Sequence, residues 1–268
     1  MISNLSIIET DNIGKNVTVG EFAIIKRDVI IGENVHIGEG TIVYPNVIIE
    51  SNTFIGPYCI LGEPAASFYD DPEKYEFKKT VIGRNSLIRS NTIIYEDVII
   101  GENLQTGHRM TIREGTRIGM HCRIGTLCDL QGKLTIGNHV NLHSNVHLGQ
   151  LSNIEDFVWI YPYVVLTNDP YPPHGKLKGV IVRKFAQIAT RATIMPGIEI
   201  GENALIGACT LVRKNVPPER VIVGNPGKDI CSVRDLKDEK GNCLYPWKDF
   251  LKDYRGYPWQ QKNDNGKQ

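Results

Sequence analysis

The chain has 268 residues, of which 41% are hydrophobic, so it can form an apolar core and is not a disordered or acidic tail protein. Its 30 Lys and Arg residues balance 30 Asp and Glu residues, which excludes bulk electrostatic attraction to nucleic acid or to an anionic membrane. At about 150 residues per domain, this length predicts one or two domains.

The start of the chain and its Cys residues indicate the cellular compartment in which the protein is expected. Residues 1–14 contain neither a basic region nor a long apolar run, so no signal peptide is expected. No stretch approaches the roughly 18 apolar residues of a membrane-spanning helix. The six Cys residues form no C-x-x-C pair, which disfavours disulfides and structural zinc. We therefore expect a cytoplasmic protein with reduced thiols and no metal.

Residues 7–62 carry a repeat of six residues. An aliphatic residue followed by Gly recurs in one register, as in Ile13-Gly14 and Val19-Gly20. The residue two positions earlier is small or β-branched, as at Val17, which predicts a short strand. Asn, Asp or Gly stands three positions later, as at Asn16 and Asn34, and these residues tolerate the left-handed backbone of a corner. A short strand and a corner every six residues predict a parallel β-helix.

Two loops interrupt this repeat, and an extension follows it. The register covers residues 82–166 and then 182–212, making 31 hexads in all. The intervening segments, 63–80 and 167–181, contain Pro, charged and aromatic residues, and loops that project from a rigid framework often bind ligands. We predict a β-helix domain over residues 1–228. Residues 229–268 form an aromatic C-terminal extension, with Tyr-Pro-Trp at 245–247 and 257–259, which we expect to dock onto the β-helix.

The corner pattern changes after residue 106. Eight corners there lack Asn, Asp and Gly: Arg109, His121, Leu127, Lys133, His139, Leu151, Phe157 and Tyr163. Five of the seven His residues lie in the same stretch. A departure from the local rule over several hexads indicates that these corners have a further role.

Asp129 and His147 are the strongest catalytic candidates. They are 18 residues apart, or three hexads, at the same outward position, so they should stack on adjacent coils about 4.8 Å apart. A carboxylate beside an imidazole raises its basicity and selects its tautomer, as a general base requires. His108 lies one coil earlier, and we expect all three side chains along one edge within roughly 10 Å. The alternative is a stacked polar pair on the surface.

Several segments resemble one group of enzymes. They are residues 105–114 (QTGHRMTIRE), 142–150 (LHSNVHLGQ), 161–173 (YPYVVLTNDPYPP), 224–228 (GNPGK) and 245–250 (YPWKDF). The chain resembles, over most of its length, the hexapeptide-repeat N-acetyltransferases that act on dTDP-linked 3-amino-3,6-dideoxyhexoses. The resemblance implies a left-handed β-helix of about ten coils, homotrimers with active sites between subunits, and a role in polysaccharide biosynthesis.

The resemblance also implies acetyl-CoA as donor and the C-3 amine of a nucleotide-linked amino sugar as acceptor. We assign catalysis to His108, Asp129 and His147. Substrate binding is expected at Arg109, His121, His139, Asn145, Tyr163 and Asp169, although His121 and His139 could equally be corner residues. The positions that match the CoA site are Thr190, Ala208, Arg213, Lys214, Asn225 and Lys228. A neutral amine needs no base to attack, so a His could orient it or accept its proton afterwards, as could the CoA thiolate.

Three other functions remain open at this point. The first is acyl transfer to a hydroxyl group or to another sugar nucleotide. The second is a γ-class carbonic anhydrase, but His108 and His143 are 35 residues apart and His108 and His147 are 39 apart, neither being the 36 residues of two coils. The third is a scaffold without catalysis, since the fold alone does not define a function.

Overall fold

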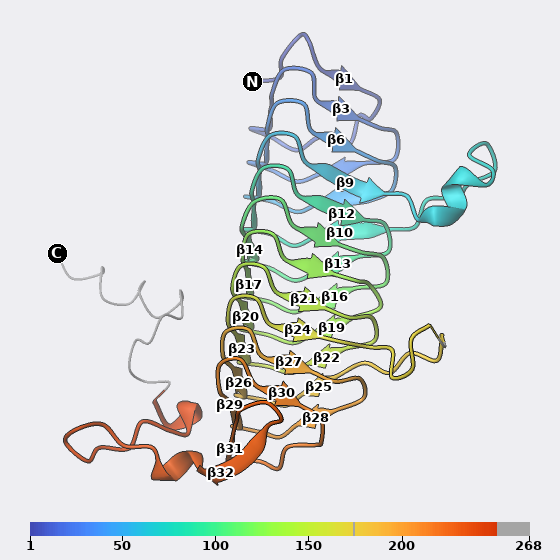
Figure 1. Ribbon diagram of the computed structural model, residues 1–268. Helices are drawn as coiled ribbons and strands as arrows, with labels where there is room; N and C mark the ends of the chain where they lie inside the picture. Colours follow the sequence, from blue (N-terminus) through green and yellow to red (C-terminus); the bar gives the residue numbers. More distant parts are fainter. Residues whose placement is uncertain (174, 251–268) are drawn as a thin grey trace, which may run out of the picture.

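The computed structural model describes residues 1–173 and 175–250, and its body is a parallel β-helix with three faces (Figure 1). We name each face after its first strand. The β2 face contains β2 (Thr18–Val19), β5 (His36–Ile37), β8 (Phe54–Ile55), β11 (Leu87–Ile88), β14 (Gln105–Thr106), β17 (Arg123–Ile124), β20 (Asn141–Leu142), β23 (Trp159–Ile160), β26 (Gln187–Ile188), β29 (Leu205–Ile206), β31 (Arg220–Val223) and β32 (Lys228–Ser232).

The other two faces are built in the same way. The β1 face contains β1 (Ile7–Ile8), β3 (Ile24–Ile25), β6 (Ile42–Val43), β9 (Ile60–Glu63), β12 (Ile93–Tyr95), β15 (Thr111–Ile112), β18 (Asp129–Leu130), β21 (His147–Leu148), β24 (Val165–Leu166), β27 (Thr193–Ile194) and β30 (Leu211–Val212). The β4 face contains β4 (Ile30–Ile31), β7 (Val47–Ile49), β10 (Thr80–Ile82), β13 (Ile99–Ile100), β16 (Arg117–Ile118), β19 (Thr135–Ile136), β22 (Asn153–Ile154), β25 (Ile181–Val182) and β28 (Glu199–Ile200).

Three edges separate the faces, and each is a column of turns. The His108 edge joins the β2 face to the β1 face and includes residues 107–109, 125–127 and 143–145. The Arg213 edge joins the β1 face to the β4 face and includes residues 113–115, 131–133 and 213–215. The His139 edge joins the β4 face to the β2 face and includes residues 119–121, 137–139 and 155–157.

The repeat explains both the core and the turns. The second residue of most strands points inward, and Ile25, Ile37 and Ile49 are fully buried. The predicted corners are confirmed, since Asn16 and Asn34 both have φ of 56°. The corners without Asn, Asp or Gly adopt the same backbone, with φ between 51° and 67° at the eight positions named above.

The predicted parallel β-helix is confirmed, but it has more turns than the ten expected. Ile2 forms a parallel bridge with Val19 before the repeat begins. Eleven parallel strands, β2 through β31, follow on the β2 face, so the solenoid has about twelve turns. The hexad count missed both ends because Ile2 precedes the repeat, and β31 pairs in parallel with β29 after the hexad register has ended.

Both loops leave the solenoid at the Arg213 edge and project to the same side (Figure 1). The first, between β9 and β10, contains the 3-10 helix η1 (Ala66–Tyr69). It is held by buried Glu96, whose carboxylate accepts hydrogen bonds from the Tyr75 hydroxyl and from the backbone N–H of Lys78 at 2.9 Å. The second loop connects β24 to β25.

The C-terminal extension returns toward the β-helix. Strand β32 pairs antiparallel with β31, and the 3-10 helices η2 (Val233–Asp235) and η3 (Trp247–Phe250) follow. Ion pairs hold it, with Arg234 bonded to Glu219 at 2.8 Å and Lys248 3.5 Å from Glu202. The second Tyr-Pro-Trp, at 257–259, lies outside the described residues, and the domain boundary at residue 228 stays a prediction. Within residues 1–173 and 175–250, no helix has the length and apolar character needed to span a membrane.

Candidate active site

Asp129 and His147 form the pair that the 18-residue spacing predicts. They are register partners on β18 and β21, and the His147 Nδ1 lies 3.1 Å from Asp129 Oδ2. Gln131 donates a second hydrogen bond to the same oxygen at 2.5 Å. The hydrogen bond from His147 is the largest of the effects that lower the pKa of Asp129. An ionised carboxylate bonded to Nδ1–H leaves Nε2 as the basic nitrogen.

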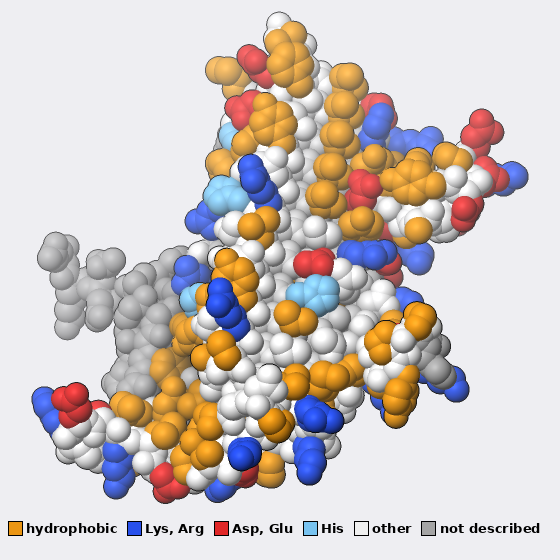
Figure 2. All heavy atoms as spheres, in the orientation of Figure 1, with side chains coloured by type: hydrophobic (Ala, Val, Ile, Leu, Met, Phe, Trp, Pro, Cys, Tyr) orange, Lys and Arg blue, Asp and Glu red, His pale blue; other side chains and the backbone are white. Residues whose placement is uncertain are grey.

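The pair lies on an accessible surface. About 40% of the Asp129 side chain and 39% of the His147 side chain are exposed. Figure 2 shows an acidic side chain and a His side chain next to each other on this surface, between the two projecting loops. A substrate can therefore reach the imidazole without displacing any element of the solenoid.

His108 lies in a turn of the His108 edge rather than on the β1 face. Its Nδ1 is 2.8 Å from the Ser90 hydroxyl, and its backbone N–H donates to Thr126 Oγ1 at 3.2 Å. The structure thus joins His108 to hydroxyl groups and joins His147 to a carboxylate. Of the three catalytic candidates, only Asp129 and His147 are hydrogen-bonded to each other.

His121 and His139 lie on a different edge from His108. Their rings stack in the His139 edge with centroids 4.9 Å apart, and His139 stacks in turn on Phe157 at 4.7 Å. Burial and the neighbouring His121 lower the pKa of His139, which favours a neutral ring. The ring column stabilises four corners with left-handed backbone, since Phe185 continues the stack below Phe157.

The other substrate-binding candidates are distributed over two regions. Arg109, Asn145 and Tyr163 all have positive φ and lie on the His108 edge. The Arg191 guanidinium lies 5.7 Å from the centre of the Tyr163 ring, from the next turn of that edge. Asp169 lies in the second loop, where its Oδ1 accepts from the backbone N–H of Tyr171 at 3.0 Å.

Four of the six CoA-site candidates divide between two edges, and the other two lie at the junction of β31 and β32. Thr190 and Ala208 occupy equivalent turns of the His108 edge, 18 residues apart. Asn225 follows β31, and Lys228 begins β32. Arg213 and Lys214 lie on the Arg213 edge, where they line a cavity of about 490 Å³ together with Pro226, Gly227 and Asp229.

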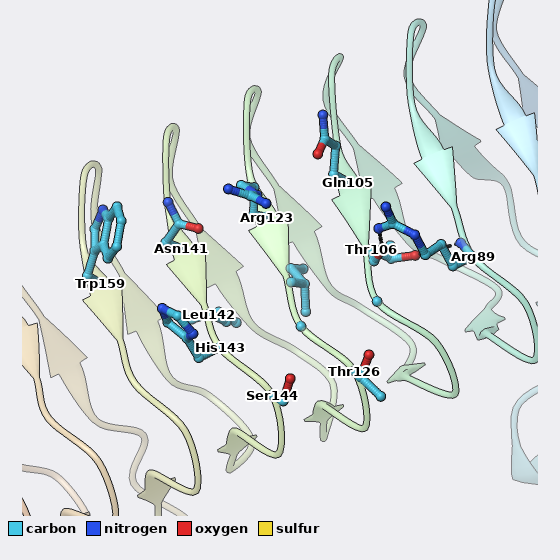
Figure 3. A pocket seen from close by; sticks show the side chains of 13 residues that line it. Arg89, Gln105, Thr106, Arg123, Thr126, Asn141, Leu142, His143, Ser144 and Trp159 are labelled. Atoms are coloured by element: carbon cyan, nitrogen blue, oxygen red, sulfur yellow. Dashed lines mark hydrogen bonds between the residues drawn. The ribbon is translucent and has the colours of Figure 1, made fainter. Parts of the chain in front are cut away.

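A cavity that sequence reasoning missed lies on the outer surface of the β2 face, beside the His108 edge (Figure 3). Its volume is about 370 Å³. The lining side chains come from five successive turns and include Arg89, Arg123, Asn141, His143, Ser144 and Trp159. The sequence signal for this cavity is the 18-residue spacing of the outward side chains Gln105, Arg123, Asn141 and Trp159.

No group of three or more His, Cys, Asp or Glu side chains suited to a metal ion occurs in the described part of the chain. The three His residues weighed for the carbonic anhydrase alternative lie at different places, with His108 in a turn of the His108 edge. His143 lines the cavity on the β2 face, whereas His147 lies on the β1 face.

Comparisons with known proteins also detect the six-residue repeat. A family model described as bacterial transferase hexapeptide (six repeats) matches residues 12–45 and 28–63. The chain is 29% identical over 114 residues to galactoside O-acetyltransferase from Escherichia coli (strain K12), a match covering 34% of this chain and 56% of that protein. It is 31% identical over 120 residues to serine acetyltransferase from Buchnera aphidicola subsp. Schizaphis graminum (strain Sg), covering 43% and 46%.

Among solved structures, UDP-N-acetylglucosamine acyltransferase from Campylobacter jejuni aligns with a TM-score of 0.48 and 16% identity, over 90% of this chain and 79% of that one. The chain spans about half the length of the two curated relatives above. The matched repeat and the observed strands coincide over residues 12–63. The chain therefore carries a hexapeptide repeat and has a parallel β-helix fold.

Proposed function

We propose that the chain is a CoA-dependent N-acetyltransferase. It moves the acetyl group of acetyl-CoA to the amine, at C-3, of a nucleotide-linked amino-deoxy sugar such as a dTDP-3-amino-3,6-dideoxyhexose. The accessible Asp129–His147 pair carries this proposal, because a His that is hydrogen-bonded to a carboxylate on an exposed surface can accept a proton from a substrate. The relatives named above are acetyltransferases, which supports an acetyl donor.

The chemistry requires a place for one proton. The neutral amine attacks the thioester carbonyl carbon, the C–S bond breaks, and the nitrogen then carries a proton that must leave. His147 Nε2 accepts this proton, while Asp129 holds Nδ1–H and stabilises the imidazolium that forms. The proton then passes to the CoA thiolate or to water, which restores the neutral imidazole.

Acetyl-CoA supplies the activated acyl group as a thioester. Arg213 and Lys214 fit its phosphates, because they line a cavity with only one carboxylate, Asp229, and that group is already paired with Arg220 at 2.7 Å. Thr190 and Ala208 lie on the other edge of the β1 face. In this proposal, one set comes from each of two neighbouring copies of the chain, so that CoA lies between subunits of a homotrimer.

A thiol-release assay tests the proposal. The full chain is incubated with acetyl-CoA and a panel of nucleotide-linked sugars that carry an amine, with the matching hydroxyl sugars as controls. We expect release of free CoA with at least one amino sugar. Absence of release with every amine would overturn the proposed reaction. Light scattering of the same preparation tests the trimer, and a monomer that turns over would contradict sites between subunits.

Acyl transfer to a hydroxyl is the second candidate. A hydroxyl needs a base in order to attack, which an amine does not, and the Asp129–His147 pair can act as that base. One relative is named as an O-acetyltransferase. Faster CoA release with the hydroxyl sugars than with the matched amino sugars would establish this alternative.

A further inference from the structure

The cavity on the β2 face has a cationic end. Arg89 and Arg123 line it, and no Asp or Glu side chain is among the lining residues. Arg89 is partly engaged, since its Nη1 donates to the Thr106 carbonyl at 2.5 Å. No carboxylate of residues 1–173 and 175–250 forms an ion pair with either guanidinium. Two positive charges without acidic partners favour an anion, and guanidinium groups match phosphate oxygens in geometry.

The opposite end of the cavity is aromatic. His143 stacks on Tyr161 with ring centroids 5.0 Å apart, and the Trp159 ring lies 6.2 Å from His143. Burial and the nearby Arg123 lower the pKa of His143, so its ring is neutral at neutral pH. Asn141, almost fully buried, adds an amide beside these rings. Flat rings with an amide at their edge suit a planar heterocycle.

The C-terminal extension supports this aromatic end. Trp247 packs edge-on against Trp159 with centroids 5.8 Å apart, and burial together with the nearby Tyr245 raises the pKa of Tyr161. The ion pair between Lys248 and Glu202 anchors the same segment. Trp159 is therefore held between the cavity and a segment almost ninety residues later in the chain.

The cavity is long enough for one ligand to contact both of its ends. Gln105, Arg123, Asn141 and Trp159 occupy equivalent positions on four successive strands, so the row spans about 14 Å at a strand spacing of about 4.8 Å (Figure 3). Thr126 and Ser144 line the cavity where it meets the His108 edge. A ligand with a ring at Trp159 and phosphates at Arg123 can direct the group attached to its phosphates toward that edge and the β1 face.

We propose that this cavity binds the nucleoside diphosphate part of the acceptor, with the base against His143 and Trp159 and the diphosphate against Arg123 and Arg89. This assignment rests on the proposed function and extends it to residues outside the catalytic pair. Trp247 is a positioning residue, because it acts through Trp159. The nucleotide part of CoA has the same chemistry, so the test must separate the two sources.

Calorimetric titration of the full chain, without acetyl-CoA, tests the site directly. The probes are dTDP, UDP and GDP, with thymidine and inorganic pyrophosphate as fragments that carry only one of the two features. We expect at least one diphosphate to bind, and the fragments to bind at least tenfold more weakly. Arg123→Gln and Trp159→Ala should each weaken that binding at least tenfold. Trp247→Ala should weaken it less, and Trp247→Phe should restore most of the affinity.

The control variant is Arg117→Gln, which removes the same charge from the same turn but on the β4 face. It should bind the diphosphate as the parent protein does, and equal losses in Arg117→Gln and Arg123→Gln would overturn the site. Saturating CoA should leave diphosphate binding unchanged, and competition would assign the cavity to CoA instead.

Turnover separates failure of the site from failure of the proposed function. Diphosphate binding without thiol release in any amine assay would refute the transferase and leave the site standing. Thiol release with an unchanged acceptor KM in Arg123→Gln would refute the site and leave the transferase standing.

Discussion

The imidazole of His147 and the carboxylate of Asp129 are hydrogen-bonded across two adjacent strands, with 3.1 Å between Nδ1 and Oδ2. Parallel pairing of β18 with β21 sets this distance, because the two residues are direct register partners. The rigid stack of strands keeps the pair together without help from a loop. Strand pairing therefore sets the geometry of the pair, which suits a preorganised proton acceptor.

The first prediction concerns the base. His147→Gln removes the basic nitrogen while keeping a polar side chain, so kcat should fall by about tenfold to a thousandfold and the KM for acetyl-CoA should stay unchanged. Steady-state kinetics measure both values. The control is His36→Gln, since His36 is also half-buried and bonded to a residue 18 positions away, Thr18, but lies on the β2 face near the N-terminus. An unchanged kcat in His147→Gln would mean that the pair is structural.

The second prediction concerns acid stability. The folded state holds the pKa of Asp129 below its unfolded value of about 3.9, so its stabilising effect is full above that value and is lost as pH falls through the folded pKa. Asp129→Asn lacks this titration. The difference in urea midpoint between the parent protein and Asp129→Asn should shrink as the pH falls from about 5 to about 3. A constant difference over that range would show that the carboxylate does not titrate with folding.

The third prediction concerns the first loop. Glu96 is 1% exposed and accepts hydrogen bonds from the half-buried Tyr75 hydroxyl and from the backbone N–H of Lys78, so Glu96→Ala leaves both donors without this partner. We expect a loss of about 1–3 kcal/mol in the free energy of unfolding and faster tryptic cleavage within residues 70–79. Glu73→Ala, at an exposed position of the same loop, is the control and should change neither. Equal cleavage rates would contradict an anchoring role for Glu96.

The fourth prediction concerns the corners. Leu127 is exposed and has φ of 58°. This left-handed backbone conformation raises the free energy of the folded state by roughly 1–2 kcal/mol for most residues, whereas Gly and Asn adopt it more readily. Leu127→Asn should therefore stabilise the protein by up to about 1 kcal/mol, measured by urea unfolding. Asn34→Leu, at an ordinary corner of the early turns, should have the opposite effect. A destabilised Leu127→Asn variant would indicate that Leu127 packs against another molecule, such as a second copy of the chain.

The fifth prediction concerns the thiols. Burial raises the pKa of Cys122 to about 12 and that of Cys59 and Cys128 to about 11, whereas Cys209 and Cys243 are exposed. A thiol-specific reagent at pH 8 should label the two exposed groups quickly and leave the three buried groups unmodified until the protein unfolds. Mass spectrometry of the labelled peptides identifies the sites. Rapid labelling of Cys122 in the folded protein would contradict its place in the core.

The sequence by itself determined the β-helix, its register and one contact of the site. The conformation of each hexad depends mainly on its own six residues. The aliphatic residue points inward, and the Asn or Asp corner adopts the left-handed backbone regardless of distant residues. The stacking of Asp129 on His147 followed from counting 18 residues along that register.

Only the tertiary structure decided where the side chains gather. The cavity on the β2 face brings together residues from Arg89 to Trp159, over five successive turns, and Trp247 reaches Trp159 through the extension, for which the hexad makes no prediction. The burial of Glu96 depends on the first loop folding back onto it. Such contacts arise from the packing of segments outside the repeat, and local periodicity carries no information about that packing.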